Sequence, residues 1–596
     1  MASGAQPDAP ASSEVQAARE LIERAAAAWQ SYRRFSQSQV DAVIDAMAAA
    51  ATANAEPLAR LAVEETTYGK VADKIQKNLF ASERVYQAIR PMRTVGELSR
   101  DPERGIIEMG EPVGVVAAIL PCTNPTSTAI YKILIALKAG NAIVLSPHPA
   151  AMRCICTTVD LMRQAAVRVG APADLIGCFG TPTQEGTKVL MTHPKTRVIL
   201  ATGGMGIVRA AYSSGKPAFG VGPGNVPAYI DPSARLDKAV ADVVKGKSFD
   251  WGTICSSEQS IVAEAGMRDA ILATLRQNHV YLMNPEQAAR LAALLIHPET
   301  FTVNPKCVGQ SPQKLAAMAG FGDAVGADIL VLAAELAGMG KQHPLSAEKL
   351  SPVLALFFMA DRESAFQRAS DLLHFGGLGH TCVIHAEDDA VIRAYGARMP
   401  AFRVVVNSPA PLGSIGATTN LFPAMTLGCG AVGGNSTGDN IGPQHLMNIK
   451  RIAWEVGSGR LPVASSQLPV AGSAPAAVGA SCGCQHAAAA GNPTSGEEAV
   501  RRAIERVLAS KGIYAVGAAP QPTFAAPAAV TPAPPAAPAP AFTPPPVAPR
   551  PKPAEFVCEA DVRAADAAGR KIVLGPKTIV TPAARDLGRE RGVFEE

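Results

Sequence analysis

The sequence predicts an α/β protein built on open parallel sheets, and two observations carry this prediction. Up to about residue 457, short apolar runs alternate with helical patterns and Gly/Pro turns, which is typical of strands connected by helices. The chain has 596 residues, of which 48% are hydrophobic and 18% are charged. It can therefore form two or three folded units and is too apolar to be disordered throughout.

The first elements expected are covering helices, followed by two buried strands. Helical patterns such as VDAVIDAMAAAATANAEPLARLAVEET precede a turn at Tyr68 and Gly69. The apolar run over 112–121 predicts a buried strand, the stretch STAIYKILIALKAGN predicts a helix, and 142–145 predicts a second strand. This succession predicts a βαβ unit, and nucleotides bind at the carboxyl ends of the strands in such sheets.

A third strand is expected over 198–202, where it enters the glycine-rich turn Gly203-Gly204-Met205-Gly206. The spacing differs from the G-x-G-x-x-G pattern of dinucleotide-binding turns, so this turn alone is weak support for a cofactor site and is also compatible with a simple tight turn.

One cysteine, Cys255 in the run WGTICSSE, follows two such glycine-rich turns. A thiol beside a nicotinamide can convert an aldehyde into a thioester. Because the thiolate is the effective nucleophile, such a site must lower the thiol pKa with backbone N–H groups or positive charge. The alternative is an inert buried thiol.

Composition excludes several classes of partner. Lys and Arg number 55 against 51 Asp and Glu, a net charge of +4, which indicates neither nucleic-acid nor membrane-surface binding. No stretch approaches the 18 consecutive apolar residues of a bilayer span. The 11 cysteines are scattered without a regular framework, and the start MASGAQPDAPASSE lacks a signal-peptide pattern, so we expect a reducing, cytoplasmic setting.

The composition changes beyond residue 457, and we expect an accessory tail there. Residues 457–494 predict a flexible linker, since 461–496 contain no charged residue. Residues 495–514 predict an amphipathic helix whose apolar stripe is Val500, Ile504, Val507 and Leu508. Residues 519–553, with 14 prolines in 35 positions, predict a semi-rigid spacer.

The last segment, 554–596, regains β-branched runs, and Thr581 and Pro582 are placed to open a final helix. We expect a small docking element there. Three potential metal ligands, Cys482, Cys484 and His486, lie in the Ala/Gly-rich linker and make a poor site, so no metal is predicted.

Eight motifs give the chain a family resemblance. They are ILPCTNPTS, VLSPHP, ATGG, GVGPGNVPAY, the Cys255 run, EKLSPVLAL, HFGGLGHTCVIH and TLGCGAVGGNSTGDNIGPQHLMNIK. In this order, over about residues 15–455, they resemble the CoA-acylating aldehyde dehydrogenases. The likeness is to the propionaldehyde and acetaldehyde enzymes of bacterial microcompartments and to the dehydrogenase half of bifunctional aldehyde/alcohol dehydrogenases.

The resemblance implies the aldehyde dehydrogenase fold. It implies a Rossmann-like cofactor domain over 12–230, completed by about 408–455 with an oligomerisation arm, and an α/β catalytic domain over 231–407 that carries Cys255. It also implies a homodimer or homotetramer.

The same resemblance makes Cys255 the nucleophile and Asn124 the amide that stabilises the oxyanion together with the Cys255 backbone N–H. Positioned donors suit that role, because addition of a thiolate to an aldehyde places negative charge on oxygen. The alternative for Asn124 is a turn residue before Pro125.

For NAD, the resemblance implies two loops and a carboxylate. Ser146, Pro147 and His148 correspond to the ribose loop; Thr202, Gly203 and Gly204 lie near the pyrophosphate; Glu348 contacts the nicotinamide ribose, unless it is an ordinary solvated Glu. The remaining cofactor residues are Pro121, Thr123, Gly222, Gly224 and Asn225. The cation nearest the ribose loop is Arg153, which mildly favours NAD over NADP and leaves both open.

One departure concerns the acyl acceptor. Val221 stands where hydrolytic relatives have the Glu that activates water, and valine is no base. We therefore expect coenzyme A as acceptor in a ping-pong reaction, with Val221, Ile254 and His380 as possible substrate or CoA contacts; a structural His380 is an equal alternative. Two alternative functions remain: a hydrolytic aldehyde dehydrogenase that uses another base, and a non-catalytic scaffold protein.

The tail resembles encapsulation peptides, which predicts a microcompartment shell or co-encapsulated enzymes as partners.

Overall fold

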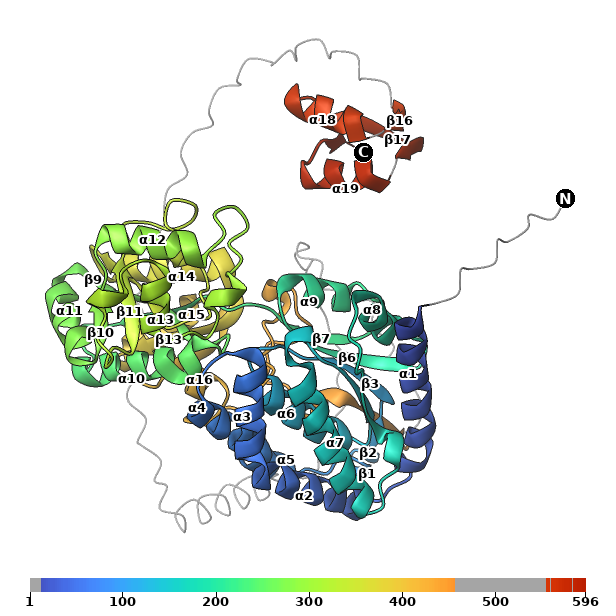
Figure 1. Ribbon diagram of the computed structural model, residues 1–596. Helices are drawn as coiled ribbons and strands as arrows, with labels where there is room; N and C mark the ends of the chain where they lie inside the picture. Colours follow the sequence, from blue (N-terminus) through green and yellow to red (C-terminus); the bar gives the residue numbers. More distant parts are fainter. Residues whose placement is uncertain (1–11, 456–553, 558, 581, 596) are drawn as a thin grey trace, which may run out of the picture. The chain divides into compact units, whose positions relative to one another are not determined.

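The computed structural model describes residues 12–455, 554–557, 559–580 and 582–595. These residues belong to two compact units, Met1–Leu468 and Pro469–Glu596, which are treated separately below. Figure 1 gives the element labels. The first unit contains two parallel sheets with helices around them, so the predicted α/β class is confirmed.

The first sheet is the one expected from the βαβ pattern. Its order is β5-β4-β3-β6-β7, and every neighbouring pair is parallel. The strands are β3 (Val115–Ile119), β4 (Ala142–Ser146), β5 (Ile176–Cys178), β6 (Thr196–Thr202) and β7 (Ala218–Val221). The β3 and β4 side chains are almost completely buried, which explains why both strands appear as continuous apolar runs.

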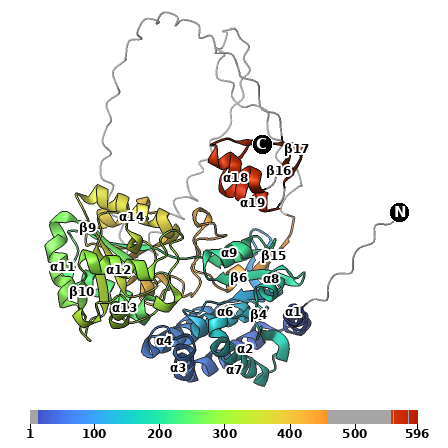
Figure 2. The same ribbon diagram turned by 45° about the horizontal axis from the view of Figure 1, so that its top comes forward.

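Helices cover this sheet on both faces. They are α1 (Ser13–Tyr32), α2 (Gln37–Ala53), α3 (Ala55–Thr66), α4 (Val71–Leu79), α5 (Val85–Ile89), α6 (Pro125–Lys138), α7 (Met152–Arg168), α8 (Gln184–Thr192) and α9 (Met205–Tyr212). Ser36 begins α2 with a capping box, and Asn54 separates α2 from α3. The helices α2, α3, α4 and α7 lie together (Figure 2).

The second sheet has the order β10-β11-β12-β9-β8-β13-β14 and is also parallel throughout. Its strands are β8 (Val226–Ile230), β9 (Glu258–Glu264), β10 (Val280–Leu282), β11 (Val331–Glu335), β12 (Val353–Met359), β13 (Gly379–His385) and β14 (Ala401–Val406). Strand β8, which lies between β9 and β13, therefore belongs to this sheet, although the domain boundary implied by the resemblance falls after it, at residue 230.

Helices pack on this second sheet as well. They are α10 (Leu236–Ser248), α11 (Arg268–Gln277), α12 (Pro285–Leu295), α13 (Pro312–Met318), α14 (Arg362–Gly376), α15 (Asp389–Arg398) and α16 (Ala410–Ser414). Separate buried clusters form on its two faces, one containing Val243 and Leu275 and one containing Tyr229 and Phe366. Burying apolar side chains on both faces fixes the register of the parallel strands.

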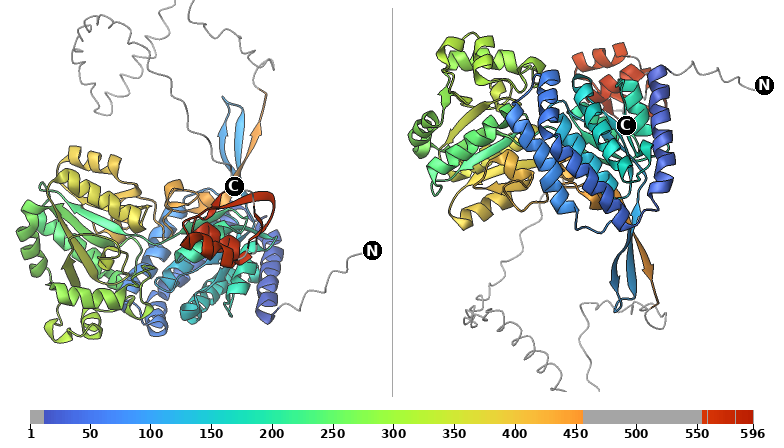
Figure 3. Two further views of the ribbon diagram at one scale, coloured as in Figure 1. Left: turned by 90° about the horizontal axis from the view of Figure 1, so that it is seen from above. Right: turned by 60° about the horizontal axis from the view of Figure 1, so that its bottom comes forward.

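A third, antiparallel sheet of the first unit projects away from the helices (Figure 3). It has the order β1-β2-β15, formed by β1 (Gly96–Asp101), β2 (Ile106–Pro112) and β15 (Met447–Ala453). Ile449, Ile452 and Trp454 are exposed on or beside β15. Its place matches the arm that the resemblance implied.

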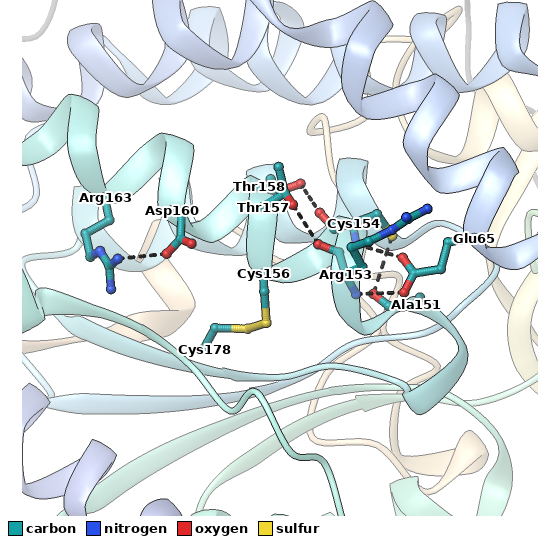
Figure 4. The surroundings of a disulfide bond; sticks show 10 residues. All are labelled: Glu65, Ala151, Arg153, Cys154, Cys156, Thr157, Thr158, Asp160, Arg163 and Cys178. Carbon is teal, nitrogen blue, oxygen red and sulfur yellow. Dashed lines mark hydrogen bonds and ion pairs between the residues drawn. A yellow bond between two sulfur atoms is a disulfide. The ribbon is translucent and has the colours of Figure 1, made fainter.

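The scattered cysteines predict a reducing setting, and the structure differs from that expectation by containing a disulfide. Cys156 of α7 and Cys178 of β5 are bonded, with a Cα–Cα distance of 5.8 Å (Figure 4). The two residues are 22 positions apart, and they meet because α7 connects β4 to β5 and packs back on the sheet. This crossover is tertiary information that cysteine spacing does not carry.

The C-terminal unit is a small α/β element by itself. It consists of β16 (Ala554–Val557), α18 (Glu559–Ala567), β17 (Ile572–Val580), α19 (Pro582–Glu590) and β18 (Phe594–Glu595), with parallel pairing in the order β16-β17-β18. Val557, Val562 and Val593 are among its buried residues. The predicted final helix does begin at Pro582.

The linker over 457–494, the amphipathic helix over 495–514 and the spacer over 519–553 lie outside the described residues. Within the described ranges, no helix has both the length and the apolar character needed to cross a bilayer.

Candidate active site

Cys255 lies in the loop that enters β9, and a tight backbone turn positions it. Asp250 and Trp251, just upstream, adopt left-handed backbone conformations with φ of 46° and 52°, which are costly for residues other than glycine. Cys255 is partly exposed. A Cβ on Gly224 would come within 2.2 Å of the Cys255 carbonyl oxygen, so only glycine allows the 220–229 segment to approach the nucleophile loop this closely.

His380, at the start of β13, lies directly beside the cysteine. Its Nε2 is 3.3 Å from Cys255 Sγ, and its Nδ1 is 2.9 Å from Thr381 Oγ1. Burial, together with the nearby Arg403 charge, lowers the His380 pKa to about 3, so the imidazole is neutral at physiological pH. The structure therefore brings together two residues that are 125 positions apart in the sequence.

The hydrogen bonds on the far side of the ring assign its tautomer. Arg403 Nε donates to Thr381 Oγ1 at 3.3 Å, and a guanidinium can only donate. The Thr381 hydroxyl proton is then free to reach His380 Nδ1, which accepts it. We therefore place the ring proton on Nε2, where it faces the Cys255 sulfur as a donor.

The local electrostatics keep the thiol protonated. Burial raises the pKa of Cys255 to about 12, and the Glu348 carboxylate adds to this effect. Glu348 is half-buried on the cavity wall, and the loss of solvation there raises its pKa to about 7. Its Oε1 accepts a hydrogen bond from Gly224 N at 3.0 Å. The Arg403 charge acts in the opposite direction on the Cys255 pKa but does not offset the effect of burial.

Asn124 stands at the first turn of α6, but its side chain does not cap the helix. Its Nδ2 donates to Thr253 O at 3.3 Å and to Thr123 Oγ1 at 3.2 Å, while its Oδ1 accepts from Lys77 Nζ at 2.5 Å. The amide thus faces the loop that leads to Cys255.

A buried charged cluster, which sequence reasoning missed, connects α4 to that loop. Lys74 and Lys77 both donate to Asp250 Oδ2, and all three side chains are nearly inaccessible. Asp250 also accepts from the Lys70 backbone N–H at 2.7 Å and from Thr253 Oγ1 at 2.6 Å. The sequence signal was only two lysines at i and i+3 of one helix, which more often indicates a solvated face.

Two adjoining cavities run along the carboxyl ends of β3, β4 and β6. The first, of ≈ 910 Å³, is lined by these predicted cofactor residues: Pro121, Ser146, Pro147, His148, Thr202, Gly203 and Gly204. The second, of ≈ 1110 Å³, is lined by Thr123, His148, Gly204, Gly222 and Glu348 among others. Cys255 and Asn124 do not line them directly, but Glu348, whose charge raises the pKa of the Cys255 thiol, lines the second cavity.

Three further predicted site residues are buried and line neither cavity: Val221, Ile254 and Asn225. Val221 ends β7 and is buried, as is Ile254. The Asn225 side chain is buried and donates to Ser346 O at 2.9 Å and to Leu372 O at 3.0 Å. Both amide protons are engaged, so Asn225 acts on the site by holding the two segments that flank Glu348 and His380.

Comparisons with known proteins agree with this arrangement. The model of the aldehyde dehydrogenase family matches residues 6–418. The chain is 43% identical over 438 residues to the bifunctional aldehyde-alcohol dehydrogenase AdhE of Escherichia coli K12, covering 73% of this chain and 49% of that protein. It thus spans about half the length of this and several other curated relatives.

Among solved structures, the chain is similar to an acetylating aldehyde dehydrogenase from Geobacillus thermoglucosidasius, with 48% identity and a TM-score of 0.73 over 75% of this chain and 98% of that one. It is also similar to a propionaldehyde dehydrogenase from the fucose utilisation bacterial microcompartment of Clostridium phytofermentans. That likeness has 30% identity and a TM-score of 0.66, covering 73% and 97% of the two chains.

Proposed function

We propose that this chain, which belongs to the aldehyde dehydrogenase family, oxidises a short aliphatic aldehyde with NAD⁺ and transfers the acyl group to coenzyme A. The observation that carries the proposal is the placement of Cys255 3.3 Å from a neutral imidazole, in the same loop that the Asn124 amide contacts at Thr253 O. Propionaldehyde and acetaldehyde are the leading substrates, in keeping with the relatives' names.

The residues of the first cavity fit a dinucleotide. Gly204 is the N-cap of α9 and no side chain caps this helix end, so its backbone N–H groups are available to a pyrophosphate. Thr202 Oγ1 is buried at the same wall without a hydrogen-bond partner among the described residues. Arg153, the nearest cation considered from the sequence, is paired with Glu64 at 2.7 Å, which favours NAD⁺ over NADP⁺.

NAD⁺, when bound, supplies the hydride acceptor. The chain's own residues carry the other steps: the Cys255 thiol releases its proton to solvent in the cavity and the sulfur adds to the aldehyde carbon, while the Asn124 amide and the Cys255 backbone N–H stabilise the resulting oxyanion. Loss of hydride to the cofactor leaves a thioester on Cys255. The sulfur of CoA then attacks this thioester, the acyl–sulfur bond to Cys255 breaks, and the proton of the CoA thiol ends on the Cys255 sulfur, which restores the thiol. The His380 Nε2–H is placed to stabilise the departing thiolate.

Water is expected to be a poor acceptor because the position assigned to the water-activating base holds buried Val221. Glu348, which lines the larger cavity and has a pKa of about 7, is the candidate base for the alternative, hydrolytic reaction. The two reactions are separated by the dependence of turnover on CoA.

The test is steady-state formation of NADH from acetaldehyde and from propionaldehyde, with and without CoA. We expect turnover that requires CoA and is abolished by Cys255→Ala. The matched control is Cys307→Ala, because Cys307 is a free cysteine buried in a core cluster beside the second parallel sheet. Free carboxylic acid formed at an undiminished rate without CoA, or full activity of Cys255→Ala, would refute the proposal.

We further propose that the protein works as a dimer or tetramer inside a bacterial microcompartment. The exposed apolar residues beside β15 and the microcompartment origin of the Clostridium relative support this, as does the tail composition. Truncation after Pro493 should leave aldehyde oxidation intact and abolish co-sedimentation with shells. Unchanged co-sedimentation of the truncated enzyme would refute the role of the tail.

A further inference from the structure

The orientation of the Asn124 amide is decided by its neighbours. An asparagine at the N-cap of a helix ordinarily turns its Oδ1 toward the free backbone N–H groups of the first turn. Asn124 occupies this position at α6, yet its side chain accepts no hydrogen bond from that turn. Its Oδ1 is instead 2.5 Å from Lys77 Nζ.

Lys77 can form a hydrogen bond only with the oxygen atom of the Asn124 amide. An ammonium group has donors and no acceptor, so the atom that it contacts must be the carbonyl oxygen of Asn124. The NH₂ group is thereby directed to the opposite side, where Nδ2 is 3.3 Å from Thr253 O in the nucleophile loop and 3.2 Å from Thr123 Oγ1. Because both of these acceptors are neutral, the amide can exchange one of them for the charged oxyanion when the aldehyde adds. A charge-assisted hydrogen bond is roughly twice as strong as a neutral one, which explains why the contact with Lys77 prevails over helix capping.

Lys77 is itself fixed by burial and by a shared counterion. It donates to Asp250 Oδ2 and lies 3.5 Å from Thr253 Oγ1. Lys74, one turn earlier on α4, donates to the same Asp250 oxygen at 3.0 Å and to Thr123 O at 3.0 Å. The two lysines therefore share their carboxylate and their burial, but of the two it is Lys77 that donates to Asn124, whereas Lys74 donates to Thr123 O.

We propose that Lys77 is a positioning residue that sets the orientation of the Asn124 amide and so prepares the oxyanion site before the aldehyde binds. This inference rests on the proposed function, since it assumes that Asn124 donates to the oxyanion. Without Lys77, the amide can rotate to cap α6, which turns its oxygen toward the site where negative charge develops. A carbonyl oxygen there repels the transition state instead of stabilising it.

The experiment compares Lys77→Met, Lys74→Met, Asn124→Ala and the double variant Lys77→Met/Asn124→Ala in the full-length protein. The readouts are the single-turnover rate of NADH formation without CoA, the KM for NAD⁺ and the thermal midpoint. We expect Asn124→Ala to lower the single-turnover rate about a hundredfold and Lys77→Met to lower it about ten- to a hundredfold, with the KM for NAD⁺ within about twofold of wild type.

Two comparisons separate positioning from a structural role. Lys74→Met removes the same kind of buried ion pair and should lower the thermal midpoint comparably, while changing the single-turnover rate less than about threefold. The double variant should be no slower than Asn124→Ala alone, because Lys77 acts only through the amide. Lys77→Arg, which keeps a donor, should recover most of the rate and serves if Lys77→Met does not fold.

Equal rate losses in Lys77→Met and Lys74→Met, or losses that multiply in the double variant, would overturn the positioning role. A wild-type rate in Asn124→Ala would instead overturn the proposed oxyanion site, so the two failures are distinguishable.

Discussion

The Cys255 thiol should react slowly and without a plateau in its pH profile, and Glu348→Gln should change that profile in a defined way. Burial raises the pKa of Cys255 to about 12, with the Glu348 carboxylate as the second cause. Glu348 has a raised pKa of about 7, so it is largely neutral at pH 6 and charged at pH 8. Its effect on the thiol therefore appears only as the pH rises through 7.

The magnitude follows from the thiolate fraction. A pKa of about 12 in place of the usual 9.0 reduces the thiolate present at pH 8 about a thousandfold. The more basic thiolate is also the better nucleophile, with a Brønsted coefficient of about 0.4–0.5, which recovers about twentyfold. Alkylation at pH 8 should thus be roughly fiftyfold slower than for an exposed thiol.

Removing the Glu348 charge should lower the Cys255 pKa by about one. This shift corresponds to about 1.4 kcal/mol, the interaction of a charge pair about 12 Å apart at an effective dielectric constant near 20 or about 6 Å apart near 40. After the Brønsted correction, alkylation of Glu348→Gln at pH 8 should be about threefold faster than in the wild type. At pH 6 the two rates should be equal, because the wild-type carboxyl is then protonated.

The assay is the rate of iodoacetamide labelling of Cys255 in the cofactor-free protein, followed by mass spectrometry of the labelled peptide from pH 6 to 9. Cys122, partly exposed and on the cavity wall, reports reagent access in the same sample. A plateau in Cys255 labelling near pH 7 would show that the thiolate already forms at neutral pH. An equal acceleration by Glu348→Gln at pH 6 and pH 8 would show that its charge is not the cause.

Three further predictions test other parts of the first unit. Thr381→Val removes the hydroxyl that fixes the imidazole tautomer and should lower the CoA-dependent kcat about tenfold, with Thr381→Ser within about twofold of wild type; equal losses in both would argue against the tautomer. Gly224→Ala places a Cβ 2.2 Å from the Cys255 carbonyl oxygen, so labelling of Cys255 and turnover should both change sharply while the protein stays folded by circular dichroism; an unaltered kcat would contradict the close approach. Reduction of the Cys156–Cys178 disulfide, or its replacement by two serines, opens a loop spanning 22 positions and should lower the free energy of unfolding by about 3 kcal/mol in urea titrations, whereas an unchanged midpoint would indicate that the bond contributes nothing.

The elements that the sequence predicted well are those whose burial is complete. The strands β3 and β4 pack on both faces, and their apolar runs at 115–119 and 142–146 therefore stand out from their surroundings. The boundary near β8 was harder, because Val226–Ile230 is an equally apolar strand and its pattern does not say which of two parallel sheets it joins. Sheet membership is decided by its partners β9 and β13, which are distant in sequence.

In the candidate site, too, the sequence predicts the residues that belong to local motifs but not those whose role depends on tertiary packing. Cys255 and Asn124 could be proposed from local motifs, whereas the proximity of His380 to the sulfur requires β9 and β13 to flank β8 in one sheet. Lys77 could not be found from the sequence, because lysine on a helix is ordinarily solvated. Its burial arises only when α4 packs against the nucleophile loop, 173 positions away.

The Asp250 carboxylate links helix α4, which carries Lys77, to the loop that carries Cys255. Asp250 lies five positions before Cys255, in left-handed backbone that few side chains tolerate, and its oxygens accept from Lys70, Lys74, Lys77 and Thr253. A buried charge with so many donors cannot move without leaving several of them unpaired. The position of the nucleophile loop and the orientation of the oxyanion donor therefore share Asp250 as an anchor. Loss of one lysine leaves Asp250 its other donors, whereas Asp250→Asn removes the charge that all of them face and should impair acylation even though Asp250 touches no reacting atom.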